Sequence, residues 1–153
     1  MPRKPKAAPG PDLPCACATA RRAARALTQW YDARMRPSQI EASQFTLLSV
    51  LDAKQACNQA VIGRMLDLDK TTLSRNLQLL KRKGWIESSP AEDGRERRFI
   101  LSSAGKQRLA AAQPAWRDAQ DQLRSELSAA EWETMWKAFR VVTQAANRLR
   151  EKQ

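Results

Sequence analysis

The stretch LDLDKTTLSRNLQLLKRKGWIE, residues 66–87, decides the fold of this 153-residue chain. Its middle predicts a helix over 70–83, because Asp69 is a favoured N-cap residue and Gly84 suits the position just after a helix end. Three leucines recur at helical spacing and mark the side expected to be buried: Leu73, Leu77 and Leu80. The helix is therefore expected to be amphipathic.

The polar side of this helix carries the candidate functional residues. Four polar side chains fall within about 60° of one another there. They are Thr71, Arg75, Gln78 and Arg82, and they are flanked by Lys70, Thr72 and Ser74. Arginine suits the guanine edge in the major groove, glutamine suits adenine, and hydroxyl groups suit phosphates. Surface helices usually mix charges of both signs, but 70–83 holds no acidic residue, so this side is expected to contact DNA rather than only solvent.

The residues before this helix predict the first half of a helix-turn-helix. A short helix through Met65 is expected to begin after Asn58, which is a good N-cap residue. Asp67 follows it, at a point where such turns often need a positive φ that Asp tolerates better than most residues. The two helices and their short turn predict a helix-turn-helix.

The residues after the helix predict a β-hairpin. Two strand-like runs, 85–88 and 98–101, flank the turn signal Asp93-Gly94. The hairpin carries three arginines that suit a narrow minor groove: Arg95, Arg97 and Arg98. The alternative is that these arginines only form surface ion pairs with Glu92 or Glu96.

Helical periodicity also predicts long helices at both ends of a mainly α-helical chain. The winged helix-turn-helix is expected over about 42–102, and the outer helices over about 15–36 and 103–150. Pro114 is expected to kink the helix that contains it or to interrupt one of its hydrogen bonds. A capping box at Ser128 starts the final helix. Its apolar stripe has more area than one lobe can cover, which predicts dimerisation. The stripe is Trp132, Met135, Trp136, Phe139, Val142, Ala146 and Leu149.

The sequence resembles the multiple-antibiotic-resistance regulator (MarR) family of winged helix-turn-helix proteins over about residues 15–150. The resemblance is carried by residues 66–87, by the wing DGRERRFILSSAG (93–105) and by SQFTLLSVL (43–51). Two residues depart from the family pattern. Glu41 stands where the family usually has a Thr N-cap, and Asp67 where it usually has Gly.

This resemblance implies an obligate homodimer in which the outer helices of two subunits intertwine. Two winged lobes would then bind adjacent major grooves of a pseudo-palindromic double-stranded operator. Arg95 would enter the minor groove with Asp93 bracing it. The resemblance also implies that a small ligand or thiol oxidation releases the protein from DNA.

Two groups of residues are candidates for receiving such a signal. Four aromatic side chains are candidates to line a ligand pocket or are ordinary core: Trp30, Tyr31, Phe45 and Trp116. Cys15 and Cys17 are candidates for a thiol sensor, since a helix N-terminus and nearby arginines lower a thiol pKa. Alternatively, the two thiols bind a soft metal or metalloid, or they are inert. Cys57 is expected to pack as a small hydrophobic residue.

Composition narrows the function further. The formal net charge of +11 favours a polyanionic partner, and the absence of histidine removes the commonest general base and transition-metal ligand. No apolar run approaches the roughly 20 residues of a membrane span, and no secretory signal is visible. Residues 1–14, with five prolines, are expected to form a disordered basic arm that either contacts the DNA backbone or is only solvated.

Together these features predict a cytoplasmic, non-enzymatic transcriptional regulator with no cofactor and no membrane partner. A sequence-specific repressor is favoured. The alternatives are a thiol-based sensor repressor that uses Cys15 and Cys17, or a nonspecific architectural DNA binder favoured by the net charge.

Overall fold

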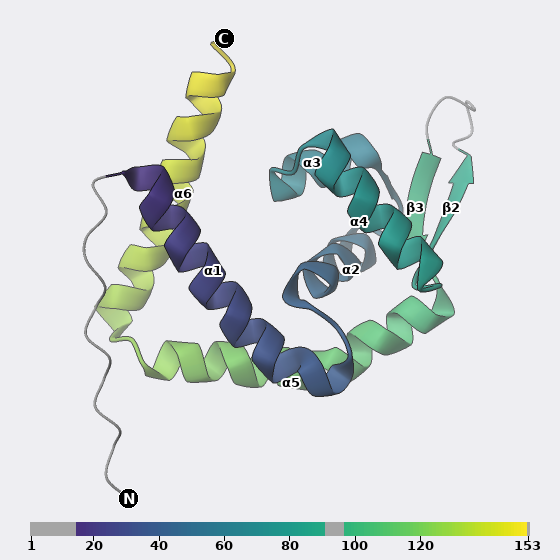
Figure 1. Cartoon of the computed structure of the whole chain (residues 1–153), viewed down its shortest axis with the longest axis horizontal. Helices are drawn as coiled ribbons and strands as arrows, with labels where there is room; N and C mark the ends of the chain where they lie inside the picture. Colours follow the sequence, from purple (N-terminus) through teal and green to yellow (C-terminus); the bar gives the residue numbers. More distant parts are fainter. Residues whose placement is uncertain (1–14, 91–96, 153) are drawn as a thin grey trace, which may run out of the picture.

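The computed structural model describes residues 15–90 and 97–152, so the predicted arm 1–14 lies outside the described residues. The chain is mainly α-helical, with a small sheet (Figure 1). Its elements are α1 (Ala16–Met35), the 3-10 helix η1 (Arg36–Ser38), α2 (Ala42–Lys54), β1 (Cys57–Asn58), α3 (Gln59–Leu66), α4 (Lys70–Arg82), β2 (Ile86–Pro90), β3 (Arg97–Leu101), α5 (Ser103–Ser125) and α6 (Ala129–Arg150). This order confirms the predicted mainly α fold with a hairpin.

The sheet is antiparallel and has β3 in its centre, in the order β1-β3-β2. The predicted hairpin is formed by β2 and β3, with Ile86 opposite Leu101. The strand β1 was not predicted, and it pairs Cys57 with Phe99 on the other edge of β3. Both edges of β3 are therefore paired, one with β2 and the other with the two residues that precede α3.

The hydrophobic core lies between α2, α3, α4, the sheet and the beginning of α5. The fully buried side chains of this lobe include Leu48, Leu51, Ile62, Leu73 and Leu80. Because all three predicted leucines of α4 are buried, its apolar side is fixed and its polar side is turned outward.

The ends of the helix-turn-helix follow the predicted capping chemistry. Asn58 Oδ1 accepts a hydrogen bond from the Val61 amide at 2.9 Å and so caps α3. Asp67 has the expected positive φ, 51°, at the end of α3. Asp69 caps α4, and Gly84 beyond its end has a φ of 71°. These local features set the direction in which α4 leaves the turn.

The departure at Glu41 is also accommodated by capping. Glu41 and Gln44 form a capping box at the start of α2, in which the Glu41 amide donates to Gln44 Oε1 at 3.4 Å. A glutamate here thus keeps the helix start intact without the threonine that is usual in the family.

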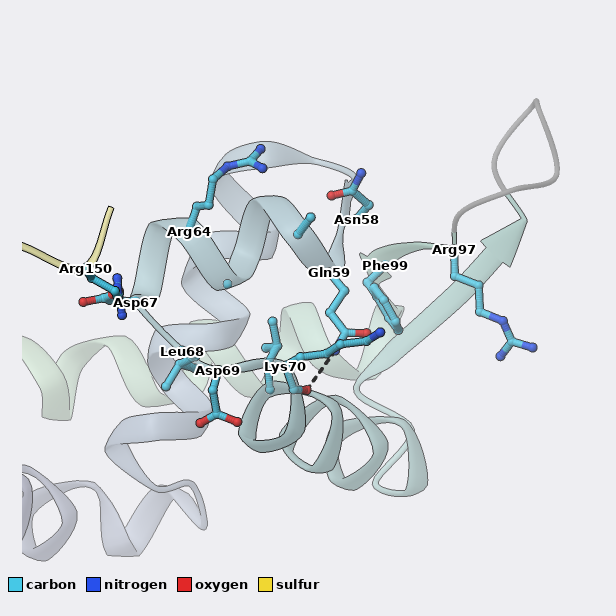
Figure 2. Close-up of a pocket in the computed structure, with 13 residues that line it drawn as sticks. Asn58, Gln59, Arg64, Asp67, Leu68, Asp69, Lys70, Arg97, Phe99 and Arg150 are labelled. Atoms are coloured by element: carbon cyan, nitrogen blue, oxygen red, sulfur yellow. Dashed lines mark hydrogen bonds and ion pairs between the residues drawn. The ribbon is translucent and has the colours of Figure 1, made fainter. Parts of the chain in front are cut away.

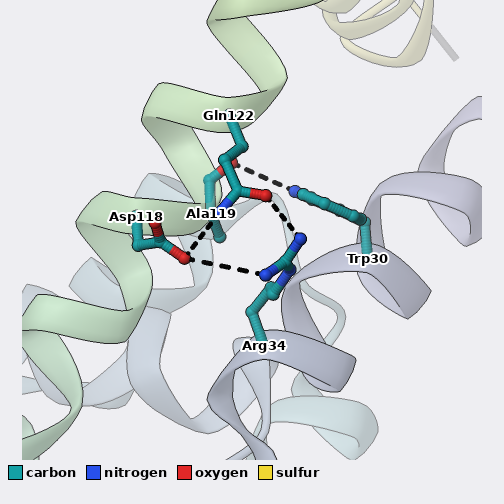
Figure 3. A network of polar contacts seen from close by, with 5 residues as sticks. All are labelled: Trp30, Arg34, Asp118, Ala119 and Gln122. Atoms are coloured by element: carbon teal, nitrogen blue, oxygen red, sulfur yellow. Dashed lines mark hydrogen bonds and ion pairs between the residues drawn. The ribbon is translucent and has the colours of Figure 1, made fainter. Parts of the chain in front are cut away.

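The helix α5 connects the winged lobe to α6 (Figure 1). It is continuous across Pro114. The helix α1 packs against α5, and Figure 3 shows polar contacts between them: the Trp30 indole donates to the Ala119 carbonyl at 3.0 Å, and Arg34 contacts Asp118 at 3.8 Å and also Gln122. These contacts hold α1 and α5 together beside the winged lobe.

The helix α6 is different, because none of its residues is buried. Trp136 is 43% exposed and Phe139 is 42% exposed, although both belong to the predicted apolar stripe. Within residues 15–90 and 97–152, no helix combines the length and the apolar character that crossing a membrane would need.

Candidate nucleic-acid interface

The polar side of α4 is turned to solvent. Its exposed side chains are Lys70, Thr71, Thr72, Arg75, Gln78 and Arg82, and Ser74 is half-buried between the two sides of the helix. The lobe therefore presents cationic and hydrogen-bonding groups together on one helix, which is the element that a major groove about 12 Å wide admits.

Thr72 lies on this surface, but its hydroxyl is already engaged. It donates to Asp69 Oδ2 at 2.6 Å, while the Thr72 amide donates to Asp69 Oδ1 at 2.9 Å. These hydrogen bonds lower the pKa of Asp69, with the hydroxyl of Thr72 as the largest cause. Thr72 therefore holds the start of α4, and its hydroxyl oxygen remains available only as an acceptor.

A basic hollow opens beside the N-terminus of α4 (Figure 2). Its volume is about 810 Å³, and it lies between α3, the α3–α4 turn, the beginning of β3 and the last turn of α6. Its polar lining consists of Asn58, Gln59, Arg64, Asp67, Asp69, Lys70, Arg97 and Arg150. Four cationic side chains thus surround one concave surface that also holds two carboxylates.

Two contacts join the elements that surround this hollow. The Gln59 side-chain amide donates to the Lys70 carbonyl at 3.1 Å, which joins the beginnings of α3 and α4. Arg150 Nη2 contacts Asp67 Oδ1 at 2.5 Å, which joins α6 to the α3–α4 turn. Figure 2 shows Arg150 and Asp67 side by side at the end of α3.

Several residues of the hollow were not predicted from the sequence. Arg64 could have been found, because it is exposed on the first helix of a helix-turn-helix, which crosses the DNA backbone in such proteins. Arg150 could not, because it meets Asp67 only through a contact that spans 83 positions of the sequence.

Both strands of the wing are described, whereas residues 91–96 between them lie outside the described residues. Arg97 and Arg98 are exposed at the start of β3, and Arg97 lines the hollow. Asp93 and Arg95, which were predicted to form the tip of the wing, lie outside the described residues. Their roles stay predictions.

The four aromatic candidates for a ligand pocket lie where α1, α2 and α5 meet. Phe45 stacks on Trp116 with ring centroids 5.6 Å apart. Tyr31 contacts Gln120 through its hydroxyl, and burial raises its pKa. Together with the Trp30 hydrogen bond to α5, these contacts give each ring a packing or bonding partner. None of the four lines the basic hollow or a second pocket of about 340 Å³ beside Lys83.

The cysteines are in two different environments. Cys15 and Cys17 are exposed at the start of α1, whereas Cys57 is buried in β1. Burial raises the pKa of Cys57, and nearby Lys54 partly opposes that shift. Within the described residues, no group of three or more side chains is arranged to hold a metal ion.

Comparison with known proteins agrees with the winged helix-turn-helix fold described above. A model of the MarR family matches residues 38–96. Comparison with curated protein sequences gives no significant match. The structure of the M. tuberculosis transcriptional regulator MosR in complex with DNA is 32% identical in sequence, with a TM-score of 0.82, and the match covers 89% of this chain and 98% of MosR.

Two further solved structures share the fold at lower identity. A Cys-to-Ser mutant of E. coli MarR, complexed with operator DNA, has a TM-score of 0.75 at 22% identity, over 82% of this chain and 91% of that one. The PcaV transcriptional regulator of Streptomyces coelicolor, in complex with its natural ligand, has a TM-score of 0.79 at 21% identity, over 90% and 99%. The chain therefore belongs to the MarR family of transcriptional regulators with the winged-helix fold.

Proposed function

We propose that the chain is a homodimeric, sequence-specific transcriptional repressor that acts in the cytoplasm. The observation that carries this proposal is the exposed side of α4, where Arg75, Gln78 and Arg82 are free of acidic neighbours on their own helix. Bases would be recognised from this side, and phosphates would be bound by hydroxyls and by arginines of the wing. The family is one of transcriptional regulators, and DNA binding accounts for the polar residues of α4 without an enzymatic role.

The homodimer is supported by α6. A 22-residue helix with exposed aromatic residues and no buried residue is costly to leave in water. A second copy of the chain is the natural occupant, because a two-fold interface pairs the same apolar surface on both subunits. The resulting two lobes would bind two half-sites about one helical turn of DNA apart.

Selection of operator DNA from a random-sequence pool tests the proposal. The wild-type protein should enrich a pseudo-palindromic duplex, and Arg75→Ala should lower its affinity for that duplex by about tenfold or more and relax base preference at one position. Arg95→Ala should weaken binding at the flanking minor groove. Arg117→Ala, a change of an exposed cation on α5, is the matched control and should have little effect.

Two outcomes would contradict this proposal. If both Arg75→Ala and Arg95→Ala leave operator affinity unchanged, neither α4 nor the wing has the proposed role. If scrambled duplex binds as tightly as the selected duplex at physiological salt, the chain is a nonspecific architectural binder instead.

A signal that releases the repressor is part of the proposal, and two kinds are considered. PcaV was solved with its natural ligand, which supports a small-molecule effector for this chain. The residues that we propose to contact it are the four aromatic candidates of the sequence, Trp30, Tyr31, Phe45 and Trp116. The exposure of both Cys15 and Cys17 supports thiol modification as the second candidate. A hydroperoxide would oxidise the two thiols to a disulfide and be reduced to an alcohol and water, whereas a soft metal would bind both thiolates.

A further inference from the structure

Arg150 is the last residue of α6, yet its side chain reaches the turn between α3 and α4. Its Nη2 atom lies 2.5 Å from Asp67 Oδ1 and 2.9 Å from Asn147 Oδ1. Asn147 belongs to the same helix, so it orients the guanidinium toward the turn. The helix that we propose for dimerisation therefore brings a cation to the helix-turn-helix.

The surroundings of this cation resemble a site for the DNA backbone. Arg150 shares the basic hollow with Arg64, Lys70 and Arg97, which come from three other elements (Figure 2). Lys70 is also the first residue of α4, the helix proposed to enter the major groove. Phosphates line both edges of that groove, so a strand of backbone that passes the N-terminus of α4 would run along the hollow that these cations line.

Asp67 competes with this role, because its carboxylate forms an ion pair with the Arg150 guanidinium in the free protein. The side chains of Arg150 and Asp67 are 66% and 45% exposed, and ion pairs this accessible to water contribute little free energy. A phosphate can accept two parallel hydrogen bonds from a guanidinium, and binding it releases counterions from DNA. Breaking the ion pair with Asp67 therefore costs little free energy when a phosphate reaches the guanidinium.

We propose that Arg150 binds the DNA backbone, and that its guanidinium exchanges Asp67 for a phosphate when DNA enters the basic hollow. This inference rests on the proposed DNA-binding function. It assigns Asp67 the role of a competitor that lowers DNA affinity. It also makes α6 a contributor to the DNA interface as well as to the proposed dimer.

The test measures DNA affinity against salt concentration by fluorescence anisotropy, with a duplex that the wild-type protein recovers from a random-sequence pool. Arg150→Ala should weaken binding roughly three- to tenfold and lower the slope of log K against log salt by about 1. Asp67→Asn should strengthen binding, because it frees the guanidinium. Asparagine tolerates the positive φ at this position, so the turn should be kept.

The double variant separates a phosphate contact from simple neutralisation of Asp67. If Arg150 binds a phosphate, adding Arg150→Ala to Asp67→Asn again lowers the affinity and the slope. If Arg150 only shields the carboxylate, the added change has no effect, and the inference is overturned. If thermal unfolding shows that Arg150→Ala is unstable, the same measurements are made with Arg150→Gln.

Arg148→Ala is the matched control, because Arg148 is exposed on the same turn of α6 but is not among the residues that line the hollow. It should leave the slope unchanged, and an equal loss in both arginine variants would show a general effect of charge and overturn the inference. If the wild-type protein recovers no duplex from the random-sequence pool, the proposed function itself is overturned. If the wild-type protein binds DNA but Arg150→Ala does not change the slope of log K against log salt, only the role of Arg150 is overturned.

Discussion

Gly105, in the first turn of α5, lies so close to Trp85 that a methyl group at position 105 would stand 1.9 Å from the Trp85 carbonyl oxygen. The same carbonyl accepts the Ser102 amide at 3.1 Å, and Ser102 Oγ caps α5 by accepting the Gly105 amide at 3.0 Å. This contact docks the beginning of α5 onto the end of the helix-turn-helix. A side chain at position 105 must therefore push the two backbones apart.

We expect Gly105→Ala to lower the free energy of unfolding by at least about 3 kcal/mol, the upper part of the range for overpacking, because the obstructing atom belongs to backbone. Urea unfolding followed by circular dichroism measures it. Gly84→Ala is the control: it has a positive φ but open space around it, so its cost should be only about 1 kcal/mol. Equal stability of the two variants would contradict the close contact.

Asp69 makes the start of α4 sensitive to acid. Hydrogen bonds from Thr72 lower the pKa of Asp69 in the folded chain, so the unfolded chain binds this proton more readily. The stabilisation is thus present above the ordinary pKa of an aspartate and is lost as the pH falls through the lower, folded value. Urea unfolding should show that Asp69→Asn is less stable than wild type at neutral pH and that the difference shrinks on acidification.

Thr72→Val is the companion variant for this pH dependence. It removes the hydroxyl that is the largest cause of the lowered pKa but keeps the amide of residue 72. It should retain part of the pH dependence, whereas Asp69→Asn should retain none that comes from this group. A stability difference between wild type and Asp69→Asn that is constant with pH would argue against the role of this carboxylate.

The boundaries of α4 could be predicted from sequence because their causes are local. Asp69, Gly84 and the leucine spacing each act within a few residues, and the structure has the helix where they place it. The positive φ at Asp67 was predictable for the same reason.

The rest of the site depends on contacts between distant residues. The strand β1 has only two residues, which is too short for any periodic pattern, and it exists because Phe99 pairs with Cys57. The link from Gln59 to Lys70 and that from Arg150 to Asp67 are likewise formed by the folded chain. The proposed DNA contacts on α4 follow from helical periodicity, whereas the hollow beside them depends on how distant segments pack in the folded chain.

The proposed dimer leads to a prediction about α6. Phe139→Glu places a charge in the exposed apolar stripe, where Phe139 lies edge-on to Trp136 with ring centroids 6.4 Å apart. We expect this variant to be monomeric in analytical ultracentrifugation and to bind the operator about 100-fold or more weaker, because linkage of the two lobes is lost. Lys137→Glu changes the charge on the opposite side of α6 and should stay dimeric. A dimeric Phe139→Glu variant would place the interface elsewhere.

The cysteines should differ in reactivity before any signal is considered. In the native protein, Cys15 and Cys17 should react quickly with a thiol reagent such as Ellman's reagent, because both are exposed, and Cys57 should react only after unfolding. Burial disfavours the Cys57 thiolate, which is the reactive form. Single Cys→Ser variants at the three positions assign each kinetic phase.

The thiol hypothesis then predicts how the operator complex responds to oxidants. Cumene hydroperoxide should release the wild-type protein from its operator, and Cys17→Ser should abolish that release, while Cys57→Ser leaves it unchanged. A disulfide between Cys15 and Cys17 would join the N-cap residue of α1 to its first turn, so oxidation should also reduce helicity at the start of α1. As(III), Cu(I) and salicylate are applied in parallel to distinguish metal binding and a small ligand from oxidation. Release that survives Cys17→Ser would exclude the thiol and leave the small-molecule effector as the signal.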